Sequence, residues 1–131
     1  MIVADASWII ALRDPLDPHH ASAIALNDAT LDDTIVLHPL TFAECLVGAA
    51  RLGQLDIAAD ALRAAFEIVG IDSEAPLRWA NLRARTRLRL PDAIVLDTAI
   101  INAANMILTF DQQLAAEAKA RAIATSGRDE A

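Results

Sequence analysis

Two aspartates in this sequence each come directly after a short, predominantly apolar segment. Asp5 follows residues 1–4, and Asp111 follows residues 106–110. Continuously apolar runs of this length are typical of buried strands in parallel sheets. The carboxyl ends of parallel strands meet at one edge of the sheet, where ligands of such folds bind. We therefore expect both carboxylates to lie at that edge.

Two further acids stand near the predicted beginnings of helices. Glu44 falls in the first turn of a helix predicted over 41–51, and Asp92 in the first turn of one predicted over 91–104. If both helices begin at the same edge, all four acids converge there. Two carboxylates about 5 Å apart repel by roughly 3 kcal/mol at an effective dielectric constant of about 20, and a divalent cation removes that cost. Oxygen-only ligands favour Mg²⁺ or Mn²⁺, which can activate water for phosphodiester cleavage.

Each acid also has a purely structural interpretation. Asp5 could form the turn after its strand, and Glu44 could complete a capping box with Thr41. Asp92 could interact with a helix dipole, and Asp111 could be the N-cap of the last helix. Taken singly, these interpretations are the better ones. Four acids at one sheet edge, however, would still need a compensating positive charge.

Apolar runs and helical patterns alternate along the chain and predict the fold. The strands are predicted over 1–4, 34–38, 66–71, 106–110 and, as a short edge strand, 123–125. The helices are predicted over 7–12, 18–29, 41–51, 55–65, 74–88, 91–104 and 112–122. The alternation indicates an α/β fold, a three-layer α/β/α sandwich with a parallel sheet of four to five strands. We expect one domain over 1–125 and a flexible tail over 126–131.

The bulk properties narrow the class of protein. A length of 131 residues suits one domain, and the single cysteine permits no internal disulfide. No apolar segment is long enough to span a membrane, and no basic leader precedes the first apolar run. We therefore expect a cytoplasmic protein without membrane association. The net charge of −7 argues against a protein that coats nucleic acid non-specifically.

The segments that carry the four acids resemble a known family. They are Ile2-Val3-Ala4-Asp5-Ala6-Ser7, Thr41-Phe42-Ala43-Glu44-Cys45-Leu46-Val47-Gly48, Leu90-Pro91-Asp92-Ala93-Ile94 and Ile107-Leu108-Thr109-Phe110-Asp111. Taken in order, they resemble the motifs of PIN domains, and more narrowly of VapC-type toxins of toxin–antitoxin pairs. Each motif is short, but the ordered set spans almost the whole chain.

The resemblance implies an endoribonuclease that depends on Mg²⁺ or Mn²⁺. It also implies a homodimer and a cognate antitoxin that blocks the site. By carry-over, the metal-site and catalytic acids are Asp5, Glu44, Asp92 and Asp111. Ser7 and Thr109 are implied as hydroxyl contacts to the metal shell or to a phosphate.

Some polar residues fit the site less well. Asp97 departs from the family pattern, in which a small residue is more usual, and it lies about 140° round the helix from Asp92. We therefore predict a peripheral or structural role for Asp97. The histidines show no metal-ligand spacing; His38 is expected in a turn, and Cys45 in buried packing.

Five of the eleven basic residues fall within twelve positions: Arg78, Arg83, Arg85, Arg87 and Arg89. These arginines could contact RNA phosphates through bidentate hydrogen bonds. They could equally form a solvated face, or a docking surface for an acidic or C-terminal segment of a partner. Arg85 and Arg89 share a helix face only if the helix runs that far.

Two other functions compete with the nuclease. One is a PIN-like module that binds RNA or a protein without cutting, which a metal titration would distinguish. The other is a receiver-like phosphotransfer domain with an acidic Mg²⁺ pocket. Such a domain needs a lysine downstream of its phosphoacceptor, and the single lysine, Lys119, lies late in the final predicted helix. This third function ranks last.

Overall fold

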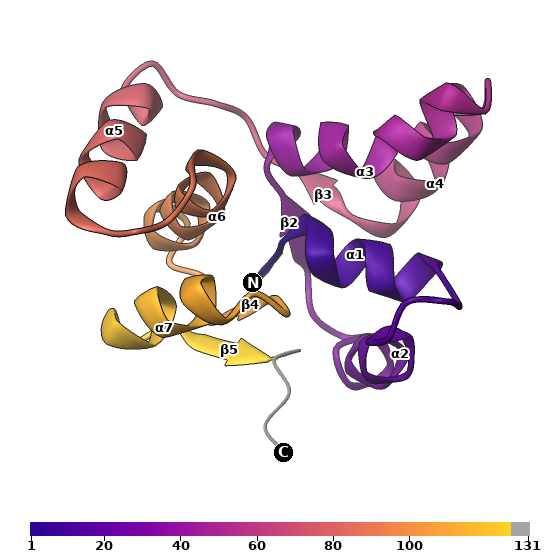
Figure 1. Cartoon of the computed structure of the whole chain (residues 1–131), viewed down its shortest axis with the longest axis horizontal. Coiled ribbons are helices and arrows are strands. Elements are labelled where there is room, and N and C mark those ends of the chain that lie inside the picture. Colours follow the sequence, from indigo (N-terminus) through magenta and orange to yellow (C-terminus); the bar gives the residue numbers. More distant parts are fainter. Residues whose placement is uncertain (127–131) are drawn as a thin grey trace.

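A computed structural model describes residues 1–126 of the chain. Five parallel strands form one sheet in the order β3-β2-β1-β4-β5 (Figure 1). The strands are β1 (Ile2–Ala4), β2 (Ile35–Leu37), β3 (Glu67–Ile68), β4 (Met106–Leu108) and β5 (Ala124–Ser126). The helices of this part of the chain are α1 (Ala6–Arg13), α2 (His20–Ala29), α3 (Pro39–Arg51), α4 (Leu55–Ala65), α5 (Ala75–Arg85), α6 (Leu90–Ile101) and α7 (Gln112–Ala120). The α/β class and the five-stranded parallel sheet are confirmed.

The sheet is covered on both faces by helices. Figure 1 shows α1 to α4 on one side of it and α5 to α7 on the other. Successive strand residues point to opposite faces, so that in β1 Ile2 and Ala4 join one core cluster and Val3 joins the other. Trp8 of α1 packs in the first cluster, and Leu96 of α6 in the second. Burial on both faces is why the strands read as continuously apolar.

The order in which strands are added to the sheet reverses between β1 and β4. From β1 the chain proceeds outward through β2 to β3, then returns through α5 and α6 to β4 on the other side of β1. The central pair is in register from Ile2 beside Met106 to Ala4 beside Leu108. The carboxyl ends of β1 and β4 therefore meet at the topological switch point, the usual place for a ligand in an open α/β sheet.

The prediction for the start of α3 was wrong. The helix begins at Pro39, and its N-cap is His38, whose Nδ1 accepts a hydrogen bond from the backbone N–H of Leu40 at 3.0 Å. Proline favours the first helical position because it lacks an N–H that would go unpaired there. Glu44 is consequently in the second turn of α3, so it cannot form a capping box with Thr41, the structural alternative considered for it.

Several other predicted boundaries differ from the structure, and three of them bear on the predictions for the arginines, the helix that carries Asp92 and the tail. The helix predicted over 74–88 ends at Arg85, so Arg85 and Arg89 do not share a helix face. The helix predicted over 91–104 ends at Ile101, and Ala103 adopts a left-handed φ of 50° just beyond it. Ser126, predicted in the tail, ends β5. The remainder of that tail lies outside the described residues.

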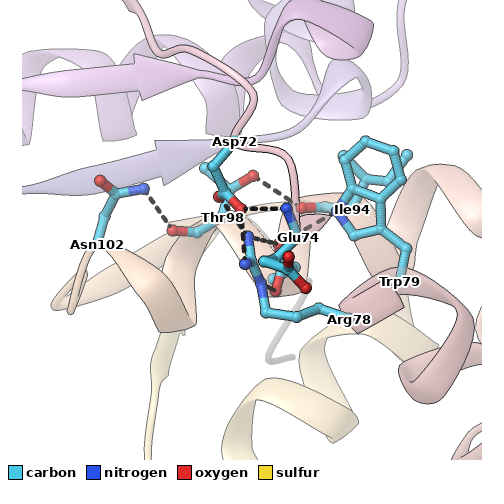
Figure 2. Close-up of polar contacts among 8 residues, drawn as sticks. Asp72, Glu74, Arg78, Trp79, Ile94, Thr98 and Asn102 are labelled. Carbon is cyan, nitrogen blue, oxygen red and sulfur yellow. Dashed lines mark hydrogen bonds and ion pairs between the residues drawn. The ribbon is translucent and has the colours of Figure 1, made fainter. Parts of the chain in front are cut away.

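A charged cluster joins α5 to α6. Arg78 donates from Nε to Asp97 at 2.8 Å and from Nη2 to the same carboxylate at 3.1 Å. Figure 2 shows Arg78 and Trp79 of α5 beside Asp72, which accepts two more hydrogen bonds from Arg78 at 3.0 and 2.7 Å. Trp79 Nε1 also donates to Asp97 at 3.1 Å. Asp97 is only 3% exposed and links α6 to α5 through these bonds, which fits the peripheral or structural role predicted from the sequence.

Within the described part of the chain, no helix combines the length and the apolar character needed to cross a membrane.

Candidate active site

Asp5 lies at the switch point, between β1 and α1, and only 5% of it is exposed. Its Oδ1 accepts hydrogen bonds from the Ser7 hydroxyl at 2.7 Å and from the backbone N–H of Trp8 at 3.1 Å. The second of these bonds makes Asp5 the N-cap of α1. Its Oδ2 accepts a hydrogen bond from the Thr109 hydroxyl. Because both oxygens are held, the carboxylate has one fixed orientation.

The hydroxyls of Ser7 and Thr109 connect the ends of β1 and β4. Each donates its proton to Asp5 and accepts a backbone N–H: Ser7 Oγ from Phe110 at 3.1 Å, and Thr109 Oγ1 from Asp111 at 2.9 Å. These bonds show both hydroxyls positioning Asp5 against β4. A contact from either hydroxyl to a metal shell or a phosphate stays a prediction.

Glu44 approaches Asp5 from α3, the helix that follows β2, and β2 is the strand next to β1. The Glu44 side chain is the most exposed of the four acids. Partial burial, followed by the negative charge of Asp5, raises the pKa of Glu44. The pKa of Asp5 is also raised, chiefly by burial and also by Asp111, although its three hydrogen-bond donors oppose the shift. The two carboxylates therefore lie within electrostatic reach of one another.

Asp92 and Asp111 complete the group from the first turn of α6 and the start of α7. Asp92 is half-buried, and burial, then the charges of Asp111 and Asp5, raise its pKa to about 6. Glu44 adds to that shift, whereas Arg89 opposes it. Asp111 is the N-cap of α7, since its Oδ1 accepts the backbone N–H of Leu114 at 2.8 Å. Both acids occupy the helix starts expected from the sequence.

The four acids share a region of negative charge that no ion pair within residues 1–126 neutralises. The ion pairs found within residues 1–126 join Arg78 to Asp72 and Asp97, and Arg121 to Glu117, and thus involve none of the four. A buried or half-buried carboxylate without such a partner is costly to ionise. The arrangement is therefore suited to binding a cation.

The carboxylate oxygens of the four acids fit a hydrated Mg²⁺ ion better than a structural zinc ion. Among residues 1–126, no three His, Cys, Asp or Glu side chains stand close enough to hold one ion between them. A closed protein cage of the structural-zinc type is therefore not formed by this part of the chain. Mg²⁺ usually takes only one or two carboxylates and keeps several waters. An open group of oxygen ligands with raised pKa values fits such a hydrated ion.

Sequence reasoning missed two features at the border of the site. Arg89, directly before α6, partly offsets the negative field at Asp92; its position three residues upstream was the available signal. The ring of Phe110 stacks on that of His19, with centroids 4.3 Å apart and planes inclined by 10°. No sequence pattern indicated this contact, because the two residues come from distant segments.

The comparisons with known proteins agree with this architecture. The PIN domain model matches residues 2–120, and the chain therefore belongs to the PIN-domain family. PIN domains generally use divalent metal ions. No curated protein matches the chain.

Three solved structures illustrate the likeness. A toxin–antitoxin complex from Klebsiella pneumoniae is 26% identical, covers 88% of this chain and 91% of its own, and gives a TM-score of 0.74. The sarcin-ricin loop cleaving toxin VapC20 of Mycobacterium tuberculosis is 17% identical, with coverages of 89% and 95% and a TM-score of 0.74. VapBC2 from Rickettsia felis, bound to a promoter DNA fragment, is 14% identical, with coverages of 96% and 98% and a TM-score of 0.70. The second and third are similar in fold alone.

Proposed function

We propose that this protein is a Mg²⁺-dependent endoribonuclease, with Mn²⁺ as a substitute ion, and the toxin of a toxin–antitoxin pair. The observation that carries the proposal is the convergence of four acids without ion-pair partners on the carboxyl edge of β1 and β4. Membership of the PIN-domain family supports nuclease activity. Similarity to a toxin–antitoxin complex supports the biological role.

The proposed roles follow from how each acid is held. Asp5 and Asp92 would hold the ion directly. Asp111 or Glu44 would hold it through the ion's own waters, because no three of these side chains stand close enough to share one ion. Bound Mg²⁺ supplies a Lewis acid for the phosphate and lowers the pKa of water. Ser7 and Thr109 keep the Asp5 carboxylate in its orientation throughout the reaction.

Glu44 is the best candidate to orient and deprotonate the attacking water. It is the most exposed of the four acids, so that water reaches it, and its pKa is raised, which makes it a better proton acceptor. The water attacks phosphorus in line with the leaving 3′ oxygen.

We further propose a cognate antitoxin and a homodimer. The antitoxin is supported by the toxin–antitoxin complex among the similar structures. Large apolar side chains on the surface, such as Leu52 at 74%, Ile57 at 75% and Leu77 at 68% exposed, provide area that a partner could cover. A short adjacent gene encoding a protein with a DNA-binding half would support this role, as would a cytoplasmic location.

Cleavage of structured RNA by Asp5→Asn and wild type tests the nuclease. Asn keeps the shape of Asp5 but removes the charge, so we expect wild-type cleavage in Mg²⁺, none in EDTA, and loss of at least about a hundredfold in the variant. Asp60→Asn, at an exposed position of α4, is the matched control and should cleave normally. Equal cleavage by wild type and Asp5→Asn, or full activity in EDTA, would refute the proposal.

The second candidate, a PIN-like module that binds RNA or protein without cutting, draws on a separate observation. No three ligating side chains among residues 1–126 are already closed around a common point. Calorimetric titration with Mg²⁺ separates the two candidates. The nuclease should bind the ion and lose that binding in Asp92→Asn, whereas a non-catalytic module has no need of it.

A further inference from the structure

Four exposed arginines follow one another from the end of α5 to the residue before α6. Arg83 and Arg85 are in the last turn of α5, Arg87 is in the connection, and Arg89 is the N-cap of α6. All four are exposed, and none belongs to an ion pair with another residue of the 1–126 region. In a chain of net charge −7 this is a pronounced local excess of positive charge. We call these four residues the arginine band.

The connection that carries half of the band is held in one conformation. The Thr86 hydroxyl donates to the carbonyl of Leu82 at 2.7 Å and accepts the backbone N–H of Leu88 at 3.2 Å. Leu88 is only 2% exposed and packs in the core cluster beneath α6. Because neighbouring residues of an extended segment point to opposite sides, burial of Leu88 directs Arg87 and Arg89 outward together.

The helix that carries the other half is fixed as well. Arg78 is excluded from the band because it is bound to Asp72 and Asp97, and it anchors α5 to α6. Arg83 and Arg85 lie on the same helix, beyond this anchor. They are two positions and therefore about 200° apart round the helix, and Arg85 is the one that lines a surface hollow together with Arg87. The backbone that carries the band is therefore preorganised, and binding of a ligand loses less conformational entropy than it would on a flexible loop.

The arginine band lies next to the candidate active site. Arg89 directly precedes α6, whose first turn contains Asp92. Beside it, a surface hollow is lined by Arg85 and Arg87 from one side and by Gln113 and Glu117 of α7 from the other. The start of α7 is capped by Asp111. The band therefore lies beside the starts of α6 and α7, which carry Asp92 and Asp111.

Charge decides what such a surface binds. The four acids repel a polyanion, and one bound divalent cation offsets only part of their charge, so cations beside the site would help to hold a phosphodiester strand there. Arginine binds phosphate in bidentate fashion, and phosphate contacts position a nucleic acid without reading its sequence. An acidic protein segment offers the same charge, but the continuity of the band with the site favours the strand that is to be cut.

We infer that the arginine band binds the phosphate backbone of the RNA on one side of the scissile bond. This inference rests on the proposed function, because it takes RNA as the substrate. The band contributes affinity and placement of the strand, while the acids perform the chemistry. Loss of the band should therefore raise KM and leave kcat nearly unchanged.

The test measures RNA binding separately from cleavage. Fluorescence anisotropy of a labelled structured RNA in EDTA compares wild type with Arg85→Gln/Arg87→Gln. The matched control is Arg13→Gln/Arg51→Gln, which removes the same charge from exposed positions on α1 and α3. We expect the band variant to bind about tenfold more weakly. The magnitude of the slope of log K against log salt should fall by about 1.4–1.8, or about 0.7–0.9 for each lost phosphate contact.

Arg85→Lys/Arg87→Lys keeps the positive charge and should restore most of the salt slope, which distinguishes lost charge from misfolding. Band-specific weakening with a normal control supports the inference. Unchanged affinity and slope overturn it, even where cleavage in Mg²⁺ proceeds. Normal RNA binding with lost binding of an acidic partner protein also overturns it. Wild type that binds through the band but never cuts would support the inference and refute the proposed nuclease.

Discussion

Replacing Asp92 by asparagine should stabilise the metal-free protein at alkaline pH. The substitution removes one charge and keeps the size of the side chain. Burial, then the charges of Asp111 and Asp5, raise the pKa of Asp92 from its ordinary value of 3.8 to about 6. The ionised carboxylate is therefore less favourable in the folded protein than in the unfolded chain.

The sign of the pH dependence follows from this difference. Because the folded-state pKa is the higher one, the folded protein binds the proton more tightly. Below pH 3.8 Asp92 is protonated in both states and has no cost; the cost grows as the pH rises and is complete above about 6. The difference between the two pKa values corresponds to a loss of roughly 3 kcal/mol in the free energy of unfolding. Since the side chain is only half-buried, screening by solvent reduces the expected gain in Asp92→Asn to about 1–2 kcal/mol.

Urea denaturation in EDTA measures this gain. At about pH 8, Asp92→Asn should unfold with a free energy about 1–2 kcal/mol above wild type, equivalent to about 3–8 °C in Tm. At about pH 4 most of the gain should disappear, because Asp92 is then protonated in the folded protein and only about half ionised in the unfolded chain. Asp60→Asn, at an exposed position of α4, should stay within about 0.5 kcal/mol of wild type at both values.

Two results would refute the reasoning. Asp92→Asn with wild-type stability at alkaline pH would show that no uncompensated negative field acts on this position. A gain of equal size at acid pH would show that it has nothing to do with ionisation. In the same assay Mg²⁺ should stabilise wild type in proportion to its binding and stabilise the variant less.

Three further perturbations test the surroundings of the site. Thr109→Val should slow single-turnover RNA cleavage at least about tenfold and lower the unfolding free energy by about 1–2 kcal/mol, because Asp5 loses a donor. Asp97→Asn should lower the unfolding free energy in urea by about 2–3 kcal/mol, less than for a fully buried pair, because Arg78 keeps a second carboxylate. Cys45 should resist iodoacetamide at about pH 8, measured by mass spectrometry, because burial raises the pKa of its thiol to about 12.

Each of these predictions has a contrary outcome. Unaltered cleavage by Thr109→Val would mean that the orientation of Asp5 does not depend on that hydroxyl. Wild-type stability of Asp97→Asn would mean that the cluster on α5 contributes no net stability. Alkylation of Cys45 as fast as in the urea-unfolded chain would mean that the thiol is not protected.

The sequence predicted the kind of each element better than its limits. Apolar runs such as 1–4 and 106–110 are strands because both their faces are buried, and burial leaves a clear pattern. β3 is only two residues long although 66–71 was predicted; it is an edge strand with Glu67 exposed, so less of it is paired. Pro39 was compatible with the end of a strand and with the start of a helix, and only the tertiary structure decides between them.

The sequence indicated which residues belong to the candidate site, but not which of them are in contact with one another. Acids after apolar runs could be recognised, because their position follows from local sequence. The strand order that makes β1 and β4 neighbours is not a local property, and the bonds from Ser7 and Thr109 to Asp5 depend on it. The same limit applies to the arginines, where only the fold separates Arg78, which is bound to acids, from the arginine band.

The pairing of β1 with β4 also sets the time at which the protein becomes complete. Asp5 and Thr109 lie 104 positions apart, and Ser7 and Phe110 lie 103 apart. During translation β1 can find β2 early, but its other edge stays vacant until β4 has left the ribosome. A nascent or prematurely terminated chain therefore lacks the finished carboxylate pocket. Under the proposed function, cleavage would come only from released molecules in which β4 has paired with β1, and an antitoxin would act at that stage.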